Sequence, residues 1–134
     1  MKQAVILLLI LTLSVSATQN GKNYQVVKSA RIFAIGGLGY AGVITDEETA
    51  FDALCKAPDA AEQFRRLLSE ATIEGQMYAL LGLRQVGASD YKTQADRYRR
   101  STRKVNSGSG CEIGPDKVSY VVNELIDKMA LKKI

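Results

Sequence analysis

The side chains of this chain that could do chemistry are carboxylates, hydroxyls and two thiols, because the sequence contains no histidine. Without an imidazole, the commonest general base at neutral pH and the commonest metal ligand are both missing. Every catalytic triad built on histidine is missing with them. We therefore predict no metal site.

Paired carboxylates can hydrolyse a glycosidic bond without histidine. The candidate groups are Asp46 with Glu47 and Glu48, Glu70 with Glu74, and Glu112 with Asp116. The first group falls at a predicted helix start, where acids complement the helix dipole. No pair is forced into a cleft by its spacing, so we predict that the protein is not an enzyme. A carboxylate-based hydrolase acting on an envelope polymer remains the alternative.

The glycines at positions 37, 39 and 42 match G-x-G-x-x-G, the pattern that cradles a pyrophosphate at a helix start. Here the pattern continues with Val43 and Ile44, and no βαβ unit follows. Ser89 and Ser101 each begin an S-x-x-K pattern, but the companion elements of serine acylases are missing. We predict no cofactor and interpret the glycines as part of a packed turn.

Cationic side chains concentrate in one segment of thirteen residues, in which Asp96 is the only acid. We take this group as the candidate interaction surface: Lys92, Arg97, Arg99, Arg100, Arg103 and Lys104. Such a surface is more typical of a solvated helix face whose arginines partly pair with neighbouring acids, and a site for a polyanion, a membrane surface or an acidic protein is the alternative. The net charge of +4 is too small to indicate nucleic acid.

The first seventeen residues have the form of a signal peptide. Lys2 precedes an apolar run from Ala4 to Leu13, and Val15 and Ala17 present the small side chains that precede a cleavage site. The run of about ten apolar residues is half of what a bilayer span needs. We predict cleavage after Ala17, no transmembrane span in the mature chain, and a periplasmic or secreted product.

Export places the two cysteines in an oxidising compartment, where one pairing is available to them. We predict a disulfide between Cys55 and Cys111, with two buried, unpaired thiols as the alternative. The elements that must position these groups follow from the hydrophobic periodicity.

We expect a loosely held lead-in over residues 18–29 and a single helical domain over residues 30–134. Two short strands, at residues 31–35 and 38–44, flank Gly36 and Gly37 as a possible β-hairpin. Helices are predicted to begin at Thr45, where Glu48 completes a capping box, at Pro58, and at Ile73 after a Thr72 cap. The helix at residues 73–86 is apolar nearly all round, so we expect it at the centre of the fold, and Gly87 closes it.

A fourth helix spans about residues 90–102, and a fifth opens at Pro115. The fifth carries the clearest apolar stripe of the chain: Val118, Val121, Val122, Leu125, Ile126 and Met129.

Residues 67–91, LLSEATIEGQMYALLGLRQVGASDY, resemble a HEAT-like helical repeat. One helix ends in a Leu-Leu pair, and the next carries the run from Ala79 to Leu83 before a turn that contains glycine. The resemblance implies α-hairpin packing and a role in protein binding. It implies no role for any single residue.

Together these observations predict a mainly α fold, a compact bundle of about five helices with a Gly-rich N-terminal segment. The predicted function is non-catalytic binding of another protein, as an inhibitor or an immunity-like protein in a bacterial envelope. The alternatives are the carboxylate hydrolase and a polyanion or membrane-surface binder acting through residues 97–104.

Overall fold

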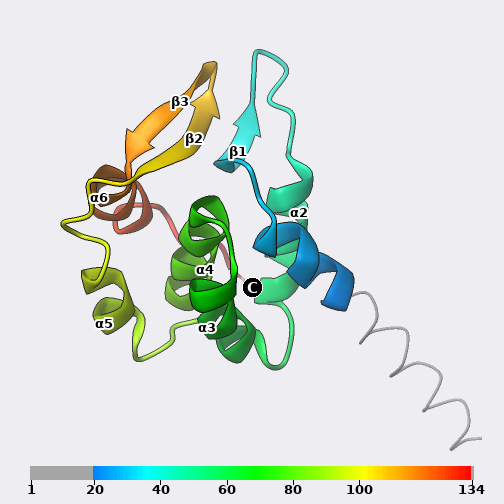
Figure 1. The fold of residues 1–134 in the computed structure, drawn as a ribbon. Coiled ribbons are helices and arrows are strands. Elements are labelled where there is room, and N and C mark those ends of the chain that lie inside the picture. The colour runs from blue at the N-terminus through cyan, green and yellow to red at the C-terminus, as the bar shows by residue number, and fades with distance from the viewer. Residues whose placement is uncertain (1–19, 134) are drawn as a thin grey trace, which may run out of the picture.

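A computed structural model of the protein describes residues 20–133 and combines helices with one small sheet (Figure 1). The predicted signal peptide lies outside the described residues. After a helical segment at residues 20–28, the elements are β1 (Phe33–Leu38), α2 (Asp46–Cys55), α3 (Ala60–Glu70), α4 (Ile73–Gln85), α5 (Tyr91–Asp96), β2 (Lys104–Gly110), β3 (Glu112–Lys117), α6 (Val118–Tyr120) and the π-helix η1 (Val121–Ile126).

The interior is built around α4, as its uniformly apolar sequence predicts. Tyr78 and Leu80 of α4 are fully buried, and so is Phe64 of α3. Gly82 lets the two helices approach closely, because a Cβ atom there would lie 2.4 Å from the ring of Phe64. Phe51 of α2 adds a third layer, with its ring centroid 5.5 Å from that of Tyr78.

Three of the predicted helices begin and end close to where the sequence places them. Thr45 and Thr72 cap α2 and α4, and each hydroxyl oxygen accepts a hydrogen bond from the backbone N–H three residues on. Gly87 follows α4 with φ +70°, the left-handed conformation that ends many helices. These local signals are confirmed because capping depends on neighbouring residues alone.

The prediction of a helical bundle is correct only in its helical part, because three strands form a sheet in the order β1-β2-β3. β1 and β2 are parallel, with Phe33 opposite Ser107, and β2 and β3 are antiparallel. The predicted turn at Gly36 and Gly37 is wrong, since both glycines lie within β1, where the pairing with β2 shifts register between Ala34 and Leu38. The chain turns later, at residues 39–42.

The fifth helix begins three residues later than predicted, because Pro115 lies within β3. A proline has no N–H to donate, and β3 is an edge strand on which one N–H can go unpaired. Val118, Val121, Val122 and Ile126 of the predicted apolar stripe are buried, and Leu125 and Met129 are partly buried against the core. The stripe lies on α6, on the π-helix η1 and, at Met129, beyond the helix end.

Two further expectations are corrected. Residues 20–28 form a helix with Tyr24 and Val27 buried in the core, where we expected a loose lead-in. α5 ends at Asp96, and the chain continues as turns through Arg100. Within residues 20–133, no helix combines the length and the apolar character that a bilayer crossing requires.

Candidate functional site

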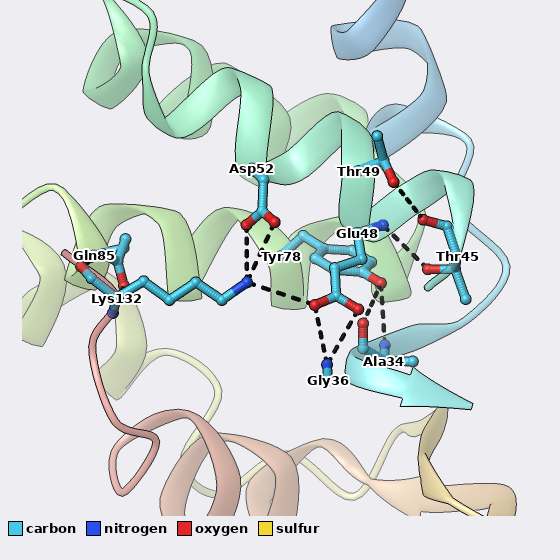
Figure 2. A network of polar contacts seen from close by, with 9 residues as sticks. All are labelled: Ala34, Gly36, Thr45, Glu48, Thr49, Asp52, Tyr78, Gln85 and Lys132. Carbon is cyan, nitrogen blue, oxygen red and sulfur yellow. Dashed lines mark hydrogen bonds and ion pairs between the residues drawn. The ribbon is translucent and has the colours of Figure 1, made fainter. Parts of the chain in front are cut away.

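The outer edge of β1, on the side away from β2, is held by side chains of α2 and α4 (Figure 2). The Tyr78 hydroxyl donates to the carbonyl oxygen of Ala34 at 2.9 Å and accepts from the Ala34 N–H at 3.0 Å. Two positions on, the Gly36 N–H donates to the Glu48 carboxylate, with its nitrogen 3.0 and 3.1 Å from the two oxygens. The backbone groups of Ala34 and Gly36 that could bond to another strand are thus hydrogen-bonded to side chains.

Glu48 has a different role from the one its sequence position predicts. In a capping box its carboxylate would bond the Thr45 N–H. The structure keeps only half of this motif: Thr45 Oγ1 accepts from the Glu48 N–H at 3.1 Å, while the Glu48 side chain turns inward to Gly36. With 2% of its surface exposed, Glu48 is a buried acid, and Lys132 Nζ lies 3.5 Å from its Oε1.

Beyond β1, the chain folds back on itself in a tight glycine turn. The N–H and C=O groups of Leu38 and Val43 bond each other at 2.8 Å, and Gly42 N–H donates to the Gly39 oxygen. Gly37 has φ +96°, and a Cβ atom on it would lie 2.5 Å from the carbonyl oxygen of Gly42. The G-x-G-x-x-G spacing is therefore explained by a turn that needs glycine, as the packed-turn interpretation expects.

This turn is joined to the tip of the β2–β3 hairpin. The Gly39 N–H donates to the Gly110 oxygen at 2.7 Å, and both segments lie at the top of Figure 1. Gly108 of β2 leaves room for neighbours, since a Cβ atom there would lie 2.5 Å from Leu38 and 3.4 Å from Ile113. The glycine turn and the hairpin tip form one continuous end of the molecule.

That end carries most of the exposed large apolar side chains. Four of the six such side chains in the described part of the chain belong to it: Tyr40, Val43, Ile44 and Ile113. We call these four residues the apolar sheet end. Tyr40 is fully exposed, and 61% of Ile113 is exposed. An exposed apolar group of this kind is typical of a contact surface.

The charge around the apolar sheet end has a single sign. Residues 32–55 and 105–116 contain acids and no lysine or arginine. Asp46 and Glu47 lie in the first turn of α2, next to Ile44, and Glu112 precedes Ile113. The end is therefore an apolar centre with an acidic border.

A groove runs beside the hairpin. Its volume is about 430 Å³, and it is lined by Ser107, Gly108, Ser109, Cys111, Glu112, Ile113, Gly114, Asp116, Tyr120 and Leu125. Glu112 and Asp116 thus share one groove, which their spacing did not require. The hydroxyl of Ser107 donates to Asp116, so one of the two acids is already engaged.

The other candidate acids have structural partners. The Tyr24 hydroxyl donates to Glu70 at 2.6 Å, and the Asn106 N–H donates to Glu74 at 3.2 Å. Burial, with the hydrogen bond to Glu70 as the next cause, raises the pKa of Tyr24 to about 12. Residues 20–133 contain no cluster of three acids or thiols that could hold a metal ion.

The predicted disulfide between Cys55 and Cys111 is wrong, because both residues are free thiols. Cys55 is the last residue of α2 and is buried, whereas Cys111 is exposed in the turn between β2 and β3. The end of α2 and this turn lie well apart in Figure 1. The count of two cysteines allowed one pairing, but the position of the hairpin prevents it.

The cationic segment divides into one partly buried residue, Arg99, and several exposed ones. Arg99 contacts Asp127 at 2.5 Å and Asp96 at 2.8 Å, and it also donates to Asn123. The hydrogen bonds to the two carboxylates, Asp127 first, raise the pKa of Arg99 above its ordinary range. Arg99 therefore joins the end of α5 to η1.

The remaining members of the segment face solvent. Lys92, Arg97, Arg100, Arg103 and Lys104 are exposed, and none of them forms an ion pair with an acid within residues 20–133. Arg97 donates to Gln94 at 3.2 Å. We call these five residues the cationic surface; Arg99 is not part of it.

The apolar sheet end was not among the residues that sequence reasoning selected. A signal for it existed, since the segment from Ile32 to Thr45 is uncharged and its apolar residues are interrupted by four glycines. A glycine turn cannot bury all of its neighbours, but only the folded chain shows which of them stay outside.

Comparison with known proteins gives no further guide. No family model matches the chain, and no curated protein and no solved structure is significantly similar to it. The resemblance of residues 67–91 to a HEAT-like repeat stays a prediction; α3 and α4 do pack against each other.

Proposed function

We propose that the protein is a binding domain for another protein and that the partner docks on the apolar sheet end. The observation that carries this proposal is the gathering of Tyr40, Val43, Ile44 and Ile113 at one end of the fold. Apolar side chains exposed singly are ordinary, whereas a contiguous exposed group favours a contact surface.

The acidic border defines the chemistry of the partner. Asp46 and Glu47 closely follow Ile44 along the chain, Glu112 precedes Ile113, and neither segment contains lysine or arginine. A partner that presents an apolar patch bordered by lysine or arginine is complementary to this end. Such complementarity speeds association and disfavours acidic competitors.

The apolar sheet end is held in place before any partner arrives. Tyr78 and Glu48 fix β1, and the Gly39 to Gly110 hydrogen bond fixes the turn against the hairpin. A surface that is ordered in advance loses less conformational entropy on binding. The network in Figure 2 therefore has a positioning role for the proposed site.

An inhibitor or immunity-like role in a bacterial envelope is the form of this proposal that we favour. It is supported by the small size of the chain and by the signal-peptide pattern of residues 1–17. The location outside the cytosol is part of the same proposal.

Capture experiments with matched variants test the proposal. The purified protein, carrying a photoreactive residue in place of Tyr40, should crosslink one stoichiometric partner from an envelope extract. The same residue in place of Glu62, which is exposed on α3, is the control and should not. The double variant Ile44→Ser/Ile113→Ser should lose the partner, whereas Glu62→Ser should keep it. Equal crosslinking from Tyr40 and Glu62 would contradict the proposal.

The cationic surface supports a second candidate function, the binding of a polyanion. Its five residues lack acidic partners within the described range, so their charge is free to act on a ligand. Retention on heparin that disappears in Arg97→Ser/Arg100→Ser/Arg103→Ser would favour this candidate. Retention that the triple variant leaves unchanged would exclude the surface.

A further inference from the structure

The last residues of the chain return to the helices and lie against α2 and α4. Gln85 contacts the main chain of Lys132 with both ends of its amide (Figure 2). Its Oε1 accepts from the Lys132 N–H at 3.1 Å, and its Nε2 donates to the Lys132 carbonyl oxygen. Arg84 donates to the carbonyl oxygen of Met129 at 2.6 Å. These contacts are made to main-chain atoms and are therefore independent of side-chain type.

The side chain at this position is recognised separately, through its charge. Lys132 Nζ lies 3.1 and 3.2 Å from the two carboxylate oxygens of Asp52 and 3.5 Å from Glu48. Burial by itself lowers the pKa of Lys132, but the Asp52 and Glu48 carboxylates outweigh it and raise that pKa. An ammonium group on a long stem is what this pair of acids accommodates.

The tail does not fill the groove that it occupies. A cavity of about 150 Å³ remains beside it, lined by Phe51, Asp52, Cys55, Lys56, Gln85, Lys132 and Lys133. Residues 130–133 have no regular secondary structure, and all four are exposed. The polar contacts of Gln85, Asp52, Glu48 and Arg84, with the packing of Met129 against the core, therefore hold this segment.

We propose that the groove between α2 and α4 is a recognition site for a lysine-bearing segment, and that the segment it accepts in trans is residues 129–133, the tail, of a second copy of this chain. The structure shows that residues 129–133 fit the site. The irregular backbone after Ile126 provides a hinge, and reciprocal exchange of the tails keeps every contact described above.

Competition from a chain's own tail sets the conditions for exchange. A tethered segment acts at an effective concentration of about millimolar, so an unmodified chain mostly occupies its own site. Exchange becomes visible when two variants are mixed. One keeps the site but has a tail that cannot bind it, and the other keeps a tail that binds but lacks the site. Neither kind of variant alone can form the complete contact.

Complementation between two full-length variants is the experiment. Lys132→Met keeps the site and removes the ammonium group, and Asp52→Asn/Gln85→Ala keeps the tail and removes the site. We expect their mixture to give, in native mass spectrometry, a heterodimer at about ten times the level of dimer in either variant alone. Lys133→Met changes the neighbouring lysine, and mixed with the site variant it should give only the background level.

Binding of a labelled peptide gives an independent measurement. A fluorescent peptide with the sequence of residues 128–134 should bind the Lys132→Met protein at least about tenfold more tightly than the Asp52→Asn/Gln85→Ala protein. A peptide with methionine in place of its second lysine from the C-terminus should lose this preference. Circular dichroism checks that each variant is folded, and Lys132→Gln replaces Lys132→Met if the latter is not.

The outcomes are decisive in both directions. A heterodimer together with selective peptide binding supports tail exchange. A heterodimer level equal to the controls overturns it even if the peptide binds, because the tail then does not reach a second copy. Equal peptide affinity for the two variants overturns the recognition site itself.

Discussion

The hydroxyl of Tyr78 pairs with both backbone groups of Ala34, donating at 2.9 Å to the oxygen and accepting at 3.0 Å from the nitrogen. A tyrosine of the central helix thereby takes the place of a neighbouring strand along the outer edge of β1. Glu48 accepts a hydrogen bond from Gly36, and the backbone of Val43 bonds that of Leu38. The edge is therefore hydrogen-bonded at every second residue. Such pairing protects an edge strand from unwanted association.

Replacing Tyr78 by phenylalanine should lower the free energy of unfolding by about 2–3 kcal/mol, because both backbone groups of the buried Ala34 lose a partner. Urea denaturation measures the change. Tyr40→Phe is the matched control, since its hydroxyl is fully exposed, and it should alter stability by less than about 0.5 kcal/mol. Equal effects of the two substitutions would show that the Ala34 contacts contribute nothing.

Stability should fall in alkali between pH 10 and 12. Burial raises the pKa of Tyr78 to about 12 and that of Tyr24 to about 12, whereas a tyrosine in an unfolded chain titrates near 10. A raised folded-state pKa contributes stability that is fully present below about pH 10 and is lost as the pH approaches 12. Urea titrations across this range should show a shallower decline in Tyr78→Phe than in the unmodified protein.

Gly37→Ala should destabilise the fold by about 2–4 kcal/mol. The φ of +96° is strained for any residue with a Cβ atom, and that atom would lie 2.5 Å from the oxygen of Gly42. Gly21→Ala is the contrasting substitution, because Gly21 is helical and has nothing within 4 Å of the added atom. It should stabilise the protein by up to about 1 kcal/mol. Thermal unfolding of the two variants in opposite directions checks both statements.

The two thiols should differ in reactivity. Burial raises the pKa of Cys55 to about 12, so hardly any thiolate forms at pH 8, while Cys111 is exposed on the hairpin turn. Iodoacetamide at pH 8 should modify Cys111 alone in the folded protein and both residues after denaturation without reductant. Mass spectrometry reads the result. A denatured, unreduced chain that takes up no label would contradict the free thiols and restore the disulfide.

Substitution of Arg99 should mainly affect stability, whereas substitution of Arg100 should mainly affect heparin binding. Arg99→Gln breaks a partly buried contact with Asp127 and Asp96, and should cost about 1–2 kcal/mol of stability. Arg100→Gln removes an exposed charge and should leave the unfolding free energy within about 0.5 kcal/mol of its original value. Heparin retention, measured on folded protein, should decrease more for Arg100→Gln. The reverse pattern would show that Arg99 belongs to the surface.

Local signals in the sequence predicted the helices well. The Thr45 and Thr72 caps, the glycine after α4 and the apolar stripe of the last helix each depend on residues a few positions apart. The same reasoning failed at Pro115, where a helix-start residue lies in an edge strand. Hairpin pairing with a glycine- and serine-rich neighbour outweighed the local preference there.

By itself, the amino-acid sequence determined that helices dominate, that α4 is central and that imidazole chemistry is absent. Only the tertiary structure decided that β1 pairs with β2 from the far end of the chain, that the two cysteines lie apart and that Glu48 faces Gly36 and Lys132. The physical reason is the distance along the chain over which each kind of interaction acts. Capping and periodicity act within about one helical turn, whereas strand pairing and buried ion pairs depend on where distant segments meet.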